Sequence, residues 1–275
     1  MTIIRVHDAD TALRAAQRRK LPVPDEVTEA AAVRDAVNAT ARLDDPERPA
    51  LPATAKETTA VIQAHAEELR LADVTRRAAG LFTDEADMRY ARAVADCVPA
   101  WMTLLDKEYQ ALVKVVRAAS DKLPADLTAL DPRRMNWTHP QHAAAYTKAE
   151  GAAVQLDQLV QDRGEIVRVT GGDGGRDNAL FSVAALPEAD IEAVMAQDWK
   201  RYAPVIGQWR DLAHQPVARW VYLTRQDRLT LSLATPGEVR QRAAEVEAWR
   251  DGTLLSHSGH NQAGARAAVT ARLGT

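Results

Sequence analysis

The sequence Gly171-Gly172-Asp173-Gly174-Gly175 divides this chain of 275 residues into two parts of different character. Before it lie alanine-rich stretches in which apolar residues recur every three or four positions, the pattern of helices. After it, short segments alternate between apolar and polar residues, the pattern of strands. The glycine cluster therefore marks the place where a helical half is expected to give way to a mixed half.

A glycine cluster that follows a strand can hold a phosphate group or can simply turn the chain. A Walker loop needs Lys and then Ser or Thr after its last glycine, whereas Arg176 and Asp177 stand there. A dinucleotide-binding loop needs a third glycine at the place of Asp177. The pattern therefore favours a hairpin turn. In the alternative interpretation, Gly172, Gly174 and Arg176 bind phosphate in a nucleotide- or phosphate-using enzyme built around residues 171–176.

Composition limits the classes of function. The chain has 35 Lys and Arg against 38 Asp and Glu, a net charge of −3, which provides no long-range attraction for nucleic acids or anionic membranes. Its one cysteine, Cys97, excludes an internal disulfide and a cysteine-based zinc cluster. No segment approaches the roughly 20 apolar residues of a membrane-spanning helix, and the first ten residues do not have the apolar run of a signal peptide. We expect a protein of the cytoplasm or of an intracellularly assembled particle, with no membrane contact and no secretion.

The residues before the glycine cluster are expected to form helices. Residues 1–53 are interpreted as an N-terminal helical arm followed by a Pro-rich linker. Thr54 and Glu57 have the spacing of a capping box, which predicts a helix that ends near Gly80. The predicted elements of this part are a short strand over 2–6 and helices over 10–20, 25–43, 54–80, 84–98, 99–122 and 141–162. The last four helices predict an antiparallel bundle over residues 54–162.

Residues 163–252 are expected to form a small α+β unit with two antiparallel β-hairpins. The predicted strand pairs are 165–170 with 179–185 and 219–224 with 229–234, and helices are predicted over 188–202 and 204–213. Thr235, Pro236 and Glu238 stand at the positions of a capped helix start and predict a helix to about Arg250. Residues 253–275 are interpreted as a flexible C-terminal tail.

Two pairs of histidines are candidate metal ligands. The pairs His139 with His142 and His257 with His260 both have a spacing that can place two imidazoles on one metal ion. Pro140 interrupts the first pair, and the second lies in a stretch rich in Ser and Gly. His257 and His260 stay as weak metal candidates, whereas exposed loop histidines are the favoured interpretation, and we predict no metal and no cofactor.

Aromatic and basic residues alternate between residues 199 and 228, which is compatible with binding to single-stranded nucleic acid. The arginines of this alternative are Arg201, Arg210 and Arg219. The register of the predicted second hairpin instead places Trp220 and Tyr222 on one face with leucines. That register favours an aromatic core against which helices bearing Trp199, Trp209 and Trp249 pack.

Taken together, the sequence predicts a mainly α-helical protein in which a helical bundle precedes a small α+β unit. An arm, a proline linker and a bundle with few aromatic residues are typical of subunits that bind neighbouring proteins. We therefore expect a non-enzymatic structural or assembly subunit of a larger complex, for example a phage virion component, with protein partners or self-association. The nucleotide-using enzyme and the nucleic-acid-binding module are the alternatives.

Overall fold

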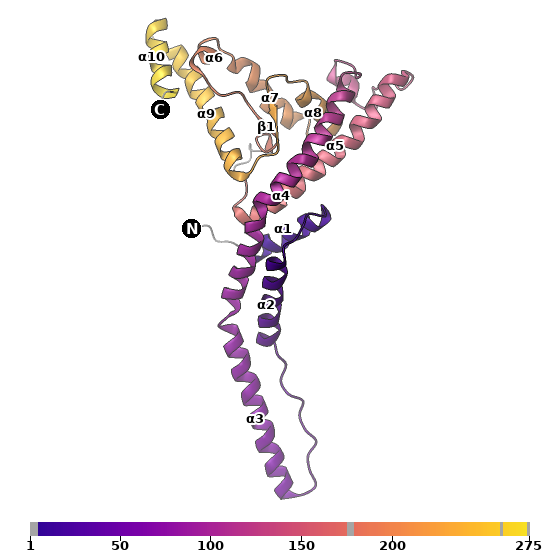
Figure 1. Cartoon of the computed structure of the whole chain (residues 1–275), viewed down its shortest axis with the longest axis vertical. Coiled ribbons are helices and arrows are strands. Elements are labelled where there is room, and N and C mark those ends of the chain that lie inside the picture. Colours follow the sequence, from indigo (N-terminus) through magenta and orange to yellow (C-terminus); the bar gives the residue numbers. More distant parts are fainter. Residues whose placement is uncertain (1–4, 175–178, 259–260, 274–275) are drawn as a thin grey trace. The chain divides into compact units, whose positions relative to one another are not determined.

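The computed structural model describes residues 5–174, 179–258 and 261–273. Within these residues the chain forms ten α-helices and a sheet of two short antiparallel strands (Figure 1). The prediction of a mainly helical protein is therefore confirmed.

The chain divides into two compact units, Met1–Cys97 and Val98–Thr275. The sequence predicted divisions after residues 53, 162 and 252, whereas the observed division falls inside helix α4 (Thr83–Ser120). The helices of residues 54–162 are shared between the two units.

Helix α4 continues through Pro99, where the sequence predicted that one helix ends and another begins. Proline inside a helix removes one backbone hydrogen bond, at a cost of about 3 kcal/mol. Tyr90 and Val94 before Pro99 and Trp101 and Leu105 after it are all buried. Burial of such side chains contributes about 1.5–3 kcal/mol each, which offsets the missing hydrogen bond.

The first unit contains three further helices: α1 (Val6–Arg18), α2 (Asp25–Ala41) and α3 (Ala55–Gly80). They confirm the predicted helices of this region within a few residues. The backbone N–H of Glu57 donates to Oγ1 of Thr54 at 3.3 Å, so the predicted cap of α3 is present. The strand predicted over residues 2–6 falls largely outside the described residues, and Val6 is the first residue of α1.

The interior of the first unit consists mostly of alanine. All four residues that α1 buries are alanines, and α3 buries only Ala72 and Ala79. One polar group joins three helices, because Asp10 of α1 accepts hydrogen bonds from Nη1 of Arg34 on α2 and from the hydroxyl of Tyr90 on α4, both at 2.9 Å. Small side chains allow close helix approach but bury little apolar area, so this unit has a thin core.

The second unit contains the rest of α4 and the following elements: η1 (Leu127–Leu130), α5 (Pro140–Val167), η2 (Arg168–Thr170), β1 (Ala184–Ala185), α6 (Ile191–Met195), α7 (Trp199–Asp211), α8 (Pro216–Thr224), β2 (Thr230–Leu231), α9 (Pro236–Ser258) and α10 (Gln262–Leu273). Helix α5 lies beside this part of α4 and runs in the opposite direction (Figure 1).

The two predicted β-hairpins are wrong, although one strand of each is present in shortened form. Residues 165–170 lie in α5 and η2, and residues 219–224 lie in α8. The remaining strands, β1 and β2, pair with each other in the register Ala184 with Leu231 and Ala185 with Thr230. Pro216 at the first position of α8 favours a helix there, and burial of Ile166 and Val167 fits the end of a long helix as well as a strand.

The helix predicted over 188–202 is interrupted at Gln197, whose φ of +61° is rare for a residue other than glycine. Helix α6 therefore ends before it, and α7 then continues through Pro204, where the sequence predicted a new helix. The C-terminal tail is not an irregular segment, because residues 262–273 form α10. Val269 of α10 is fully buried with Val194 of α6 and Trp249 of α9.

Two aromatic clusters fill the second unit. The rings of Trp220 on α8 and Trp209 on α7 meet edge to face with centroids 5.1 Å apart. Trp249 on α9 stacks with Trp199, at 6.3 Å between centroids. Trp220 is therefore a core residue as predicted, but it belongs to a helix, and Trp199 and Trp249 form a separate cluster.

Candidate protein-interaction surface

The glycine cluster ends a helix. Gly171, Gly172 and Gly174 have φ angles of 99°, 67° and 80°, which favour glycine because they lie in the left-handed region. The N–H groups of Gly171 and Gly172 donate to the carbonyls of Arg168 and Val167, both at 2.9 Å. These groups cap the C-terminal end of the α5–η2 helix, where exposed carbonyls disfavour an anion. The backbone of Gly171 and Gly172 therefore serves the helix end, and Arg176 lies outside the described residues.

A buried arginine holds the glycine loop. The side chain of Arg163 on α5 is 1% exposed and forms an ion pair with Asp173. Its Nε also donates to the carbonyl of Ala234 at 2.9 Å, just before α9 begins. Asp173 thus ties the loop to α5, and this part of the cluster contributes to the fold.

The histidines contact other parts of the protein. His139 caps α5 by accepting from the N–H of His142 at 3.3 Å, and the two imidazoles stack with centroids 3.9 Å apart. His257 lies in α9, where its Nδ1 is 2.6 Å from the carbonyl of Thr253 and its Nε2 is 3.2 Å from the amide of Gln197. His260 lies outside the described residues. In the part of the chain that the structure describes, no three His, Cys, Asp or Glu side chains are grouped to hold a metal ion.

The aromatic and basic residues of α7 and α8 are engaged within the protein. Arg219 forms an ion pair with Asp157 and lies 4.5 Å from the centre of the Trp209 ring. Trp220 donates from Nε1 to the same carboxylate at 2.7 Å. Arg201 pairs with Asp198 at 3.4 Å. Arg219 and Trp220 therefore contribute to the packing of the second unit.

None of the described helices combines the length and the apolar character that a membrane crossing needs.

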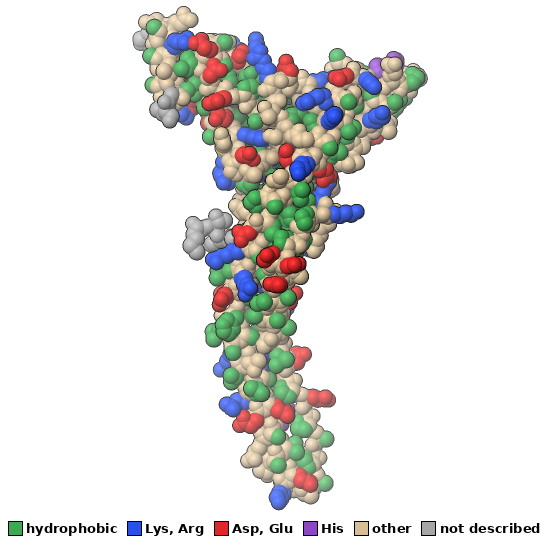
Figure 2. Space-filling view, in the orientation of Figure 1, with side chains coloured by type: hydrophobic (Ala, Val, Ile, Leu, Met, Phe, Trp, Pro, Cys, Tyr) green, Lys and Arg blue, Asp and Glu red, His purple; other side chains and the backbone are tan. Residues whose placement is uncertain are grey.

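Apolar side chains gather at the surface of the first unit. Of the fourteen large hydrophobic residues that are exposed within the described residues, ten lie between residues 33 and 88. Figure 2 shows hydrophobic side chains along the surface of α3. Large exposed apolar patches are typical of surfaces that bind another molecule.

Three of these residues, together with Ala78, form a line that runs along α3 to its C-cap residue, Leu81. Leu71, Val74, Ala78 and Leu81 are spaced three, four and three residues apart, which places them on one face of a helix. We call them the apolar stripe. Leu71 is 68% exposed, Val74 53% and Leu81 83%, and Ala78 is also exposed.

The apolar stripe faces away from the interior of its own unit. The buried residues of α3 are Ala72 and Ala79, which are seven residues, or about two turns, apart on another face of the helix. Helix α2 packs against α3. The helix thus uses its small residues for internal packing and presents its large apolar residues outward.

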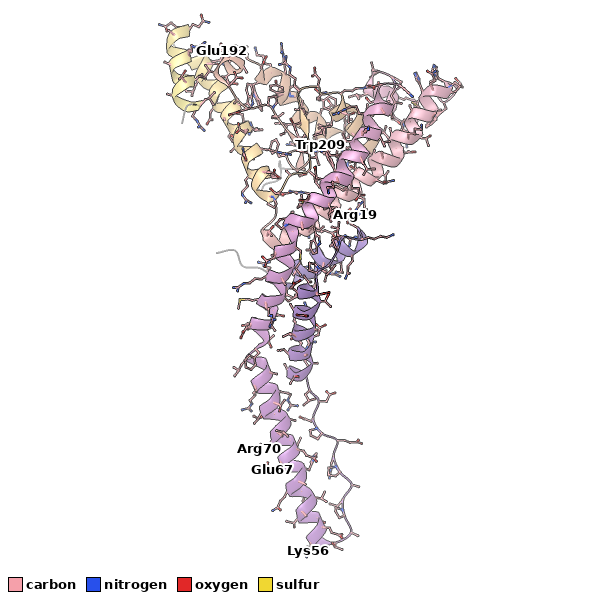
Figure 3. The ribbon with its side chains drawn as sticks, viewed as in Figure 1. Arg19, Lys56, Glu67, Arg70, Glu192 and Trp209 are labelled. Carbon is pink, nitrogen blue, oxygen red and sulfur yellow. The ribbon has the colours of Figure 1, made fainter. Side chains whose placement is uncertain are left out.

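Charged pairs border the stripe without covering it. Glu67 and Arg70, labelled in Figure 3, form an ion pair at 3.0 Å, and Arg77 pairs with Asp73 at 3.0 Å. Both pairs lie along α3, and a polar border around an apolar centre is typical of a protein interface.

Comparison with the models of known families, with curated proteins and with solved structures found no match for this chain.

The apolar stripe is not among the sites that the sequence predicts. Helix α3 has apolar residues on more than one face, so its pattern lacks the single apolar face of a surface helix. The signal that was available is the spacing of Leu71, Val74 and Leu81, together with the observation that the remaining apolar residues of α3 are mostly alanine.

Proposed function

We propose that this protein is a non-enzymatic structural or assembly subunit of a larger complex, such as a virion, and that the apolar stripe is its contact surface. The observation that carries the proposal is the exposure, in one line, of Leu71 and Val74 of α3 and of its C-cap residue Leu81. The spacing is that of a helix packed against another helix.

The energetics support a covered stripe. Transfer of a leucine side chain from water to a protein interior contributes about 1.5–3 kcal/mol. Leu71 and Leu81 leave most of this contribution unused in the isolated chain. The first unit also has a core composed largely of alanine, so a partner on the stripe would add apolar burial where the unit has least.

Thiol labelling tests the proposal for any kind of partner. A Val74→Cys variant places a reporter in the stripe, and burial raises the pKa of the native Cys97 thiol, which keeps that group slow to react. We expect a maleimide to label position 74 at least about tenfold more slowly in the complex isolated from the natural source than in the dilute purified chain.

Leu254→Cys is the matched control, because Leu254 is 70% exposed but lies on α9, outside the stripe. Its labelling rate should be the same in both states. Equal rates at position 74 in the complex and in the dilute chain would show that nothing covers the stripe and would contradict the proposed function.

A further inference from the structure

The second unit has a groove between α4 and α5 with a volume of about 640 Å³. Its sides are formed by Val115, Ala118 and Ala119 of α4 with Lys122, two residues after that helix ends, and by Gln141, Ala144, Ala145 and Lys148 of α5, which have the spacing i, i+3, i+4 and i+7. We call this the alanine groove. Four alanines line it, and with their short side chains a third helix can approach the two backbones closely.

The alanine groove and the apolar stripe have complementary shapes. The groove follows seven residue steps of α5, or about 10 Å at the rise of an α-helix. The stripe segment from Leu71 to Ala78 has the same number of steps and therefore the same length. The groove is lined by small residues, whereas Leu71 and Val74 of the stripe have large side chains. These two side chains would therefore fill the space between α4 and α5.

The charges of the two surfaces are complementary as well. The groove is lined by Lys122 and Lys148 and by no carboxylate. Asp84 and Glu85 are exposed in the first turn of α4, directly after the stripe, and the arginines beside the stripe are already paired with carboxylates of their own helix. Lysine stems are long enough to lie along an apolar helix while their ammonium groups reach such carboxylates.

We propose that the apolar stripe of one copy of this chain docks in the alanine groove of a second copy. This inference rests on the proposed function and adds the identity of the partner. The two surfaces are different, so the contact is head-to-tail: every copy in a row uses its stripe on one neighbour and its groove on the other. Such contacts build rings if the rotation closes and filaments if it does not.

Mixing two full-length variants tests the head-to-tail contact. One variant carries Leu71→Lys and Leu81→Lys, which put charge into the stripe. The other carries Ala144→Trp, which fills the groove from an exposed position. We expect each variant alone to weaken self-association by at least about a hundredfold in light scattering or sedimentation, relative to the wild-type chain.

The mixture distinguishes the possible contacts. An equimolar mixture retains one intact stripe and one intact groove, so it should form a 1:1 dimer with wild-type affinity and nothing larger. Leu254→Lys and Ala267→Trp are the matched controls, because both residues are exposed and lie on α9 and α10, which carry neither the stripe nor the groove. Both control variants should associate as the wild type does.

Each other outcome overturns the inference. If the stripe variant fails to associate while Ala144→Trp associates normally, the stripe binds something other than the groove. If the wild-type chain stays at its monomer mass of 30.1 kDa at all concentrations, the second copy is not the occupant. In both cases the rate at which maleimide labels position 74 in the native complex still tests the proposed function independently.

Discussion

At the scale of single residues, the polar contact that holds the first unit together is the carboxylate of Asp10. It accepts from Tyr90 and from Arg34, whose guanidinium also lies 4.2 Å from the centre of the Tyr90 ring. The three side chains come from α1, α2 and α4. In a unit with an alanine core, such a partly buried contact between helices replaces part of the specificity that large apolar side chains provide elsewhere.

Tyr90 allows this contact to be followed by pH. Burial of the hydroxyl, and then its hydrogen bond to Asp10, raises the pKa of Tyr90 to about 12. The unfolded chain releases this proton near pH 10, so the contribution of Tyr90 to stability is complete below pH 10 and is lost as pH rises through 12. We expect ultraviolet titration at 295 nm to show a tyrosine ionising near pH 12 that disappears in Tyr90→Phe.

The same variant should lower the free energy of unfolding of the first unit by about 1 kcal/mol at pH 7, because one hydrogen bond is lost while Arg34 still pairs with Asp10. Tyr222→Phe is the comparison, since burial raises the pKa of Tyr222 but that residue belongs to the second unit. A titration in which Tyr90→Phe removes a group ionising near pH 10 would show that the contact is absent in solution.

At the scale of elements, the sequence predicts helix starts far better than strand pairs. The cap residues Thr54 and Thr235 begin α3 and α9 as expected, because a hydroxyl that accepts from the backbone three residues later is a local interaction. The sequence predicts strands over 165–170 and 219–224, but short runs of β-branched and aromatic residues fit a buried helix as well as a strand. The choice between them depends on burial against distant segments, which no local pattern contains.

The start of α9 shows how much one cap contributes. Oε2 of Glu238 accepts from the backbone N–H of Thr235 at 2.7 Å, and this contact holds the pKa of Glu238 below its usual range. The stabilisation is therefore present above the unfolded pKa of about 4.3 and is lost as pH falls through the lower folded value. Glu238→Ala should reduce the free energy of unfolding by about 1 kcal/mol at pH 7 in urea titrations, and by much less at pH 3.

Glu247→Ala is the matched control on the same helix, because it removes only an exposed ion pair with Arg250 and should cost less than about 0.5 kcal/mol. Equal losses for the two variants at pH 7 would mean that the cap contributes no more than an ordinary surface charge.

At the scale of the whole molecule, the two units differ in what stabilises them. The large buried side chains Trp101, Trp220 and Trp249 all belong to the second unit, whereas the first unit buries mainly alanines. The candidate interaction surface follows the same division, because the apolar stripe lies on the unit with the thinner core. Neither the division inside α4 nor the outward face of α3 could be predicted from the sequence, since both depend on which apolar faces find a partner within the chain.

This difference predicts that the first unit unfolds before the second. All six tryptophans lie after residue 98, so tryptophan fluorescence reports only the second unit, whereas circular dichroism at 222 nm reports helices in both. In urea at low protein concentration, we expect part of the helical signal to be lost before the fluorescence changes. Raising the protein concentration should move this first transition to higher urea, because a partner that binds only the folded stripe stabilises it by mass action. The Leu71→Lys, Leu81→Lys variant should show no such shift, and coincident transitions at all concentrations would show that the thin core is not the weaker part.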